Sequence, residues 1–216
     1  PALVRLKSAM VGTAIAEFFR DQGYSVLLMM DSLTRFAMAQ REIGMAIGEP
    51  PVSRGFTPSV YAIMPKLLER AGNGRKGSIT GLYTVLVEGD DMDEPISDTV
   101  RGILDGHIVL SRKLANAGHY PAIDVLQSIS RLMPDVVEGE NLKMSRYLRG
   151  VMSTYKETQD LISIGAYKKG SSKKIDEAVD LIDAINGLLC QQVDERFTYD
   201  DTMALLKTIY DGRYME

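Results

Sequence analysis

The residue best placed for chemistry is Asp31, which ends the apolar run Val-Leu-Leu-Met-Met at positions 26–30. Such a run between a glycine and a helix predicts a strand buried on both faces. An aspartate that follows a strand lies at the edge of an open α/β sheet where ligands bind. Its carboxylate suits Mg²⁺, a hard and strongly hydrated cation. Aspartate also begins many helices, so this segment alone leaves Asp31 as a metal ligand or as a helix cap.

A second group of candidates lies between positions 119 and 131. Tyr120, beside Pro121, has a ring on which a flat base can stack; the alternative is a tyrosine packed at a turn. Arg131 is of the type that enters a neighbouring subunit's site and stabilises charge on a transferring phosphoryl group. The alternative for Arg131 is a surface ion pair, which in isolation is the more frequent role of an arginine.

Other chemistries find less support. The acidic stretch Glu88–Glu94 lacks the spacing of a calcium loop, so we expect a solvated turn or pairing with Arg101 or Arg112. The two histidines, His107 and His119, do not have metal-ligand spacing. Cys190 follows an apolar helical pattern and is expected to be inert packing.

The elements that position these residues alternate between strand and helix. Helices are predicted near residues 3–22, 34–44 and 59–71, and strands near 26–30, 78–87, 107–110 and before Arg131. This order predicts an α/β fold with a mainly parallel sheet flanked by helices. After Gly139 only helical periods remain, so we predict a nucleotide-binding domain at residues 1–138 and a helical domain at 139–216.

Composition narrows the class of protein. The net charge is −4 among 216 residues, which argues against a nucleic-acid binder with a clustered basic patch. No apolar run is long enough to span a membrane. The single cysteine cannot form an internal disulfide, which favours a reducing cytoplasm.

Several stretches together resemble one family. Residues 21–44, 48–60, 65–72, 76–112 and 120–136 are similar to flagellar protein-export ATPases and their type III secretion relatives, and GILDGHIVLSR with YPAIDVLQSISR carries most of the likeness. These ATPases in turn resemble the catalytic beta subunit of rotary ATP synthases. The resemblance implies a RecA-like nucleotide domain, a helical C-terminal domain and a hexameric ring with ATP sites between subunits.

The resemblance also implies a role for each site residue. Asp31 matches the Walker B aspartate, which holds Mg²⁺ through water, and Arg131 matches the arginine finger that acts in trans. Tyr120 matches the tyrosine that flanks the adenine of ATP. Arg35 lies near the site without a separate role, and Phe197 is placed near the adenine pocket.

The phosphate loop G-x-x-x-x-G-K-[ST] does not occur in the sequence, nor does the Gly-Glu-Arg segment whose Glu positions the attacking water. We expect both upstream of Pro1, so the chain resembles the C-terminal half of the usual polypeptide. Because the backbone amides and lysine that cradle the phosphates are missing, we predict that this chain alone neither binds ATP tightly nor hydrolyses it.

The resemblance further implies partners: export chaperone–substrate complexes, a stalk subunit in the ring's pore and a regulator, at the cytoplasmic face of the inner membrane. Three alternatives stay open. They are a rotary ATP synthase-type catalytic subunit, a ring-shaped RNA helicase, and a docking module without turnover. The segments MAQREIG and EGDDMDEP favour the export branch, and the lack of interleaved basic and aromatic residues speaks against the helicase.

Overall fold

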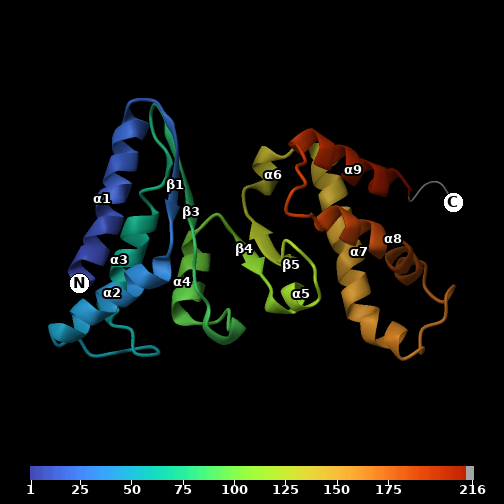
Figure 1. Cartoon of the computed structure of the whole chain (residues 1–216), viewed down its shortest axis with the longest axis horizontal. Helices are drawn as coiled ribbons and strands as arrows, with labels where there is room; N and C mark the ends of the chain where they lie inside the picture. Colours follow the sequence, from blue (N-terminus) through green and yellow to red (C-terminus); the bar gives the residue numbers. More distant parts are fainter. Residues whose placement is uncertain (213–216) are drawn as a thin grey trace. The chain divides into compact units, whose positions relative to one another are not determined.

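The computed structural model describes residues 1–212. The chain divides into two compact units, the first Pro1–Leu104 and the second beginning at Asp105. Figure 1 shows the first unit in blue to green and the second in yellow-green to red.

The first unit is organised around the parallel pair of strands β1 (Ser25–Met30) and β3 (Ser78–Tyr83). Their register runs from Ser25 opposite Ser78 to Met30 opposite Tyr83. The short strand β2 (Gly72–Asn73) pairs antiparallel with β3. Parallel pairing brings the carboxyl ends of β1 and β3 together, so Asp31 and the residues after Tyr83 meet at one edge.

The prediction that the first strand is buried on both faces is wrong for the described residues. Side chains along β1 alternate between half-buried and exposed, and Leu27 and Met29 are 61% and 67% exposed. Helix α1 (Ala2–Asp21) packs on the strand, as Figure 1 shows. The run of apolar residues alone does not reveal whether a second layer covers the other face of the strand.

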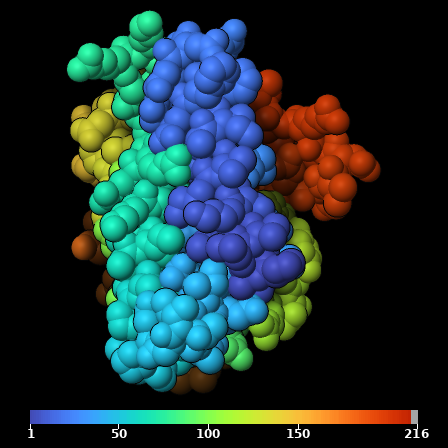
Figure 2. Space-filling model, turned by 90° about the vertical axis from the view of Figure 1, so that its left-hand side faces the viewer, coloured from blue at the N-terminus to red at the C-terminus, as the bar shows by residue number. Residues whose placement is uncertain are grey.

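Helices supply the core of this unit. They are α1, α2 (Leu33–Ala46), α3 (Pro58–Leu68) and α4 (Pro95–Ile103), with a 3₁₀ turn, η1, at Glu88–Asp90. Their fully buried side chains include Leu33, Met64, Leu67 and Ile96. Pro58 lies in the first turn of α3, where its missing N–H costs no helical hydrogen bond. Figure 2 shows α1 at the front of this face, with α2 and α3 beside it.

The second unit begins with an antiparallel pair, β4 (Gly106–Leu110) and β5 (Ile123–Ser130). Only residues 111–122 connect them, including the short helix α5 (Arg112–Asn116). The α/β class is confirmed, with parallel pairing in the first unit and antiparallel pairing here.

The rest of the second unit is helical, as predicted. After α6 (Met133–Val136) come the long helices α7 (Gly139–Ser163), α8 (Lys173–Leu189) and α9 (Tyr199–Gly212). Helices α7 and α8 share the buried residues Leu148, Val151, Ala178 and Ile185. Residues 139–212 form no strand, and the last four residues of the predicted helical domain lie outside the described chain. In the described part, no helix has the length and apolar character to cross a membrane.

Candidate functional site

Asp31 lies directly after β1, at the carboxyl end of the parallel pair. Its side chain is exposed, and its Oδ1 accepts a hydrogen bond of 2.9 Å from the hydroxyl of Thr84. The backbone N–H of Thr84 donates to the carbonyl of Met30 at 3.1 Å. The carboxylate is therefore held where the two strands end and faces solvent, which is the position of ligand sites in open α/β sheets.

The alternative of Asp31 as a helix cap is wrong. The N-cap of α2 is Ser32, whose backbone is extended and whose Oγ accepts from the N–H of Arg35 at 3.2 Å. Ser32 is buried, and its hydroxyl accepts a hydrogen bond from a backbone N–H at the start of the helix that has no partner within the helix. The carboxylate of Asp31 is left for another role.

Thr84 was not identified from the sequence. It lies in the segment after β3, where Leu33 N–H donates to its carbonyl at 2.9 Å and Leu86 N–H donates to the hydroxyl of Thr34 at 2.8 Å. These bonds fasten the segment to the start of α2. The available signal was a hydroxyl residue within the second predicted strand, a frequent but weak pattern.

The residues around Asp31 fit a magnesium ion held mostly by non-protein ligands. Within residues 1–212 no group of three or more His, Cys, Asp or Glu side chains is placed to hold a metal. Mg²⁺ commonly binds through one or two carboxylates, with water and substrate phosphates filling the other positions. An exposed single carboxylate steadied by a hydroxyl matches that ligand set.

Arg35 lies in the first turn of α2, close to Asp31 in sequence, and is exposed. Its guanidinium makes no hydrogen bond or ion pair with residues 1–212. An exposed cation with no ion pair among these residues suits contact with an anionic ligand such as a phosphate.

Tyr120 and Phe197 belong to the second unit. Tyr120 lies between α5 and β5, is 56% exposed, and precedes Pro121 through a cis peptide. Phe197, 50% exposed, lies in the segment between α8 and α9. This segment begins beside Tyr120, because Gln191 N–H donates to the Tyr120 carbonyl at 2.8 Å. Two half-exposed rings on neighbouring segments suit contact with a flat base.

Arg131 directly follows β5 and is exposed. Its backbone N–H donates to the carbonyl of Asp105 at 2.7 Å, which fixes the chain at the end of the strand. The first unit therefore holds Asp31 and Arg35, and the second holds Tyr120, Arg131 and Phe197. A single site shared by these five residues stays a prediction.

The structure gives more detail on two further sequence predictions, those for the acidic stretch and for Cys190. In the acidic stretch, Arg101 lies 3.4 Å from a carboxylate oxygen of Asp93, as expected. Asp91, however, is bound by Arg54, and this hydrogen bond holds the pKa of Asp91 below its usual value. Cys190 is not on the helix: it caps α8, and its Sγ lies 3.4 Å from Nδ1 of His119.

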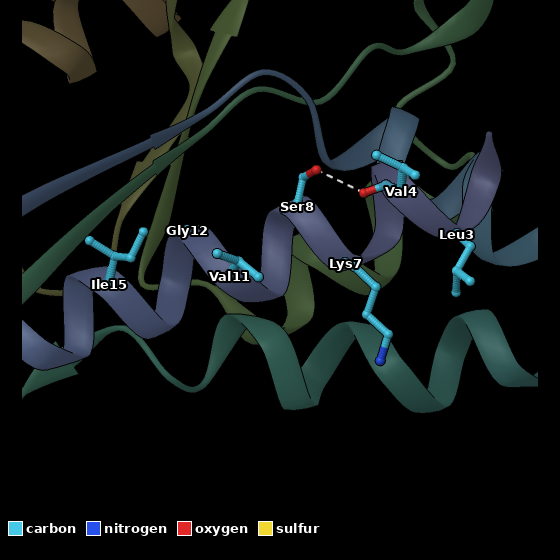
Figure 3. Close-up of a pocket in the computed structure, with 7 residues that line it drawn as sticks. All are labelled: Leu3, Val4, Lys7, Ser8, Val11, Gly12 and Ile15. Carbon is cyan, nitrogen blue, oxygen red and sulfur yellow. Dashed lines mark hydrogen bonds between the residues drawn. The ribbon is translucent and has the colours of Figure 1, made fainter.

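A shallow groove follows one side of α1 in the first unit (Figure 3). It is lined by Leu3, Val4, Lys7, Ser8, Val11, Gly12 and Ile15, all from that helix. The lining is mostly apolar and contains none of the predicted site residues. We therefore do not assign a nucleotide to it.

Comparison with known proteins identifies the class of protein to which this fold belongs. Residues 1–130 match the nucleotide-binding domain of the ATP synthase alpha/beta family. The chain belongs to this family. Residues 137–208 match the C-terminal domain of the type III secretion ATPase EscN. The two matches adjoin near the boundary predicted at Glu138, which stays a prediction because the compact units divide at Leu104.

Relatives within the family are named for the flagellum and for type 3 secretion. The chain is 56% identical to the flagellum-specific ATP synthase of Bacillus subtilis, covering 97% of this chain and 48% of that protein. It is 54% identical to the type 3 secretion system ATPase of Xanthomonas euvesicatoria, again covering 97% and 48%. The chain thus spans about half the length of the curated relatives it matches.

Solved structures agree in fold. The assembled ATPase EscN of the enteropathogenic E. coli type III secretion system matches with a TM-score of 0.94 and 49% identity, over 97% of this chain and 51% of that one. EscN in complex with its central stalk EscO matches with a TM-score of 0.88 and 48% identity, over 97% and 50%.

Proposed function

We propose that this chain is the C-terminal part of a ring-forming ATPase that couples ATP hydrolysis to flagellar or type III protein export. The observation that carries the proposal is the exposed carboxylate of Asp31 at the carboxyl end of β1, next to a helix that Ser32 already caps. The names of the relatives support the export role.

In this proposal each residue has a defined task. Asp31 binds Mg²⁺ through water, and Thr84 keeps the carboxylate oriented by its 2.9 Å hydrogen bond. Bound Mg²⁺ would neutralise charge on the β- and γ-phosphate oxygens of ATP. Arg35 contributes positive charge close to the same corner.

The remaining residues act from the second unit. Tyr120 and Phe197 contact the adenine, since their rings are half exposed and aromatic faces bind flat bases. Arg131 extends into the site of the adjacent subunit and stabilises negative charge on the phosphoryl group in the transition state. The ATP sites therefore lie between subunits of a hexamer.

The partners and location form part of the proposal. The EscN structure with EscO supports a stalk subunit in the ring. Export chaperone–substrate complexes and a regulator are proposed as further partners, at the cytoplasmic face of the inner membrane. The match of residues 137–208 to a secretion ATPase domain supports the export branch over a rotary ATP synthase.

The test compares Mg²⁺-dependent ATP hydrolysis by the full-length protein, a polypeptide of the relatives' length, with that of this chain alone. We expect turnover by the full-length ring and none by the chain. In the full-length protein Arg131→Ala should lower kcat about 10³-fold, while Arg146→Ala, which removes an exposed arginine of α7, leaves it unchanged. A full-length ring without ATPase activity, or an Arg131→Ala variant with normal kcat, contradicts the proposal.

A further inference from the structure

Strand β5 is irregular just before Arg131. Pairing with β4 joins Val109 to Asp124 and then His107 to Ile129, so the register shifts and β5 bulges between Asp124 and Ile129. Inside the bulge, the hydroxyl of Ser128 donates to the carbonyl of Asp124 at 2.7 Å. A bulge removes backbone groups from the ladder, and each half-buried carbonyl then needs another donor.

The side chain of Asp124 accepts hydrogen bonds inside the bulge. Its carboxylate accepts from the backbone N–H of Gln127 at 3.0 Å and from the side-chain amide of Gln127 at 2.8 Å. Lys156 of α7 lies 3.7 Å from the same carboxylate. Burial raises the pKa of Asp124, but the hydrogen bonds from Gln127 and the charge of Lys156 outweigh it, so the net pKa lies below the usual value. The carboxylate is therefore ionised at neutral pH and keeps these bonds.

The bulge carbonyls are bound by one guanidinium from α7. Arg149 donates from Nη1 to the carbonyls of Val125 and Ser128, the latter at 3.2 Å, and from Nη2 to the carbonyl of Leu126 at 3.3 Å. The planar guanidinium carries several N–H donors in a fixed arrangement, whereas the ammonium of lysine is a compact group with three. Only arginine is well suited to join three carbonyls at once.

The chain between this bulge and Arg131 has little freedom. Gly106 pairs with Ser130, and a Cβ at Gly106 would collide with the carbonyl oxygen of Ile129. The N–H of Arg131 is bound to the carbonyl of Asp105 at 2.7 Å. The position of Arg131 is thus set on one side by β4 and on the other by the carbonyls that Arg149 holds.

We propose that Arg149 is a positioning residue that ties α7 to the end of β5 and so sets where Arg131 enters the neighbouring subunit's site. The inference rests on the proposed role of Arg131. In this role Arg149 acts through the backbone of β5 and not by contact with substrate. Because Arg149 belongs to α7, it links the position of this helix to that of Arg131.

The test measures steady-state ATP hydrolysis by the full-length ring with one of three single substitutions: Arg149→Met, Arg149→Lys or Arg131→Ala. A fourth variant combines Arg149→Met with Arg131→Ala. We expect Arg149→Met to lower kcat at least tenfold with little change in KM for ATP, because the arginine finger acts mainly in the transition state. Arg149→Lys should fall between Met and the native residue. In the Arg131→Ala background, Arg149→Met should lower kcat no further.

Arg146→Ala, on the same helix, is the matched control and should leave kcat unchanged. Size-exclusion chromatography reports whether each variant still forms the ring; if Arg149→Met does not, the Lys variant decides, and a normal kcat for Lys overturns the inference. The inference also fails if Arg149→Met has a normal kcat, or if it lowers kcat equally with and without Arg131. A normal kcat for Arg131→Ala instead removes the proposed function and this inference with it.

Discussion

The hydroxyl of Thr84 and the carboxylate of Asp31 are joined by a 2.9 Å hydrogen bond at the point where β1 and β3 end side by side. Only Oδ1 of the carboxylate is engaged within residues 1–212. The other oxygen is left for water, which suits a carboxylate that binds Mg²⁺ through its hydration shell.

A pair of substitutions separates the charge of Asp31 from its orientation. In the full-length ATPase, Asp31→Asn should lower kcat about a hundredfold or more, because the carboxylate charge opposite Mg²⁺ is lost. Thr84→Val keeps the charge and removes one hydrogen bond, so we expect about a fivefold loss. Kinetics as a function of Mg²⁺ concentration checks both. Equal effects of the two substitutions would argue against a metal role for Asp31.

Tyr120 is expected to serve through its ring alone. Tyr120→Ala should weaken ATP binding by the full-length protein roughly tenfold or more, since base–aromatic stacking is worth about 1–3 kcal/mol. Tyr120→Phe should bind normally. Equilibrium binding of a fluorescent ATP analogue measures the difference, with Tyr199→Ala, which removes another exposed tyrosine of the same unit, as the control. Weak binding by the Phe variant would point to the hydroxyl instead.

The ion pair between Glu17 and Arg70 gives the first unit a pH-dependent stability. Two hydrogen bonds of 2.8 and 2.6 Å join them, and each side chain is 27% exposed. The hydrogen bond from Arg70 is the main cause that lowers the pKa of Glu17 below its reference of 4.5. A lowered folded-state pKa means that the stabilisation is complete above about pH 4.5 and is lost as the pH falls through the folded-state value.

Glu17→Gln should therefore reduce the free energy of unfolding by about 1 kcal/mol at pH 7, and the difference should shrink below pH 4.5. Urea unfolding of this chain at pH 7 and at a pH below 4.5 measures this difference in the free energy of unfolding. Glu42→Gln is the control, because Glu42 and Arg5 are 63% and 48% exposed, and it should change stability by less than about 0.5 kcal/mol. A Glu17→Gln effect of the same size at low pH would contradict the account.

The sequence predicted the parts of the site that local pattern controls. The apolar run before Asp31 predicted a strand with a carboxylate at its end, and the structure has both. It left Asp31 as either a metal ligand or a helix cap. The structure has Ser32 as the cap of α2, and this choice between adjacent residues depends on backbone angles.

Features that depend on distant residues were not predictable from one sequence. Arg54 binds Asp91 from a separate loop, and no local spacing relates them. The exposure of Leu27 and Met29 depends on what covers the strand, and the contacts of Arg149 depend on a bulge that carries no clear sequence signal. Thr84 was missed because a lone hydroxyl at a strand end has many ordinary roles.

The claim that Asp31 and Arg131 of different subunits share one ATP site is tested most directly with mixed rings. Full-length Asp31→Asn and Arg131→Ala proteins are each expected to be nearly inactive. When the two are dissociated, mixed and reassembled, some interfaces contain native Asp31 from one subunit and native Arg131 from its neighbour. We predict that ATPase activity returns to a measurable fraction of the native rate. Reassembled mixed rings that stay as inactive as either parent would contradict a site shared between subunits.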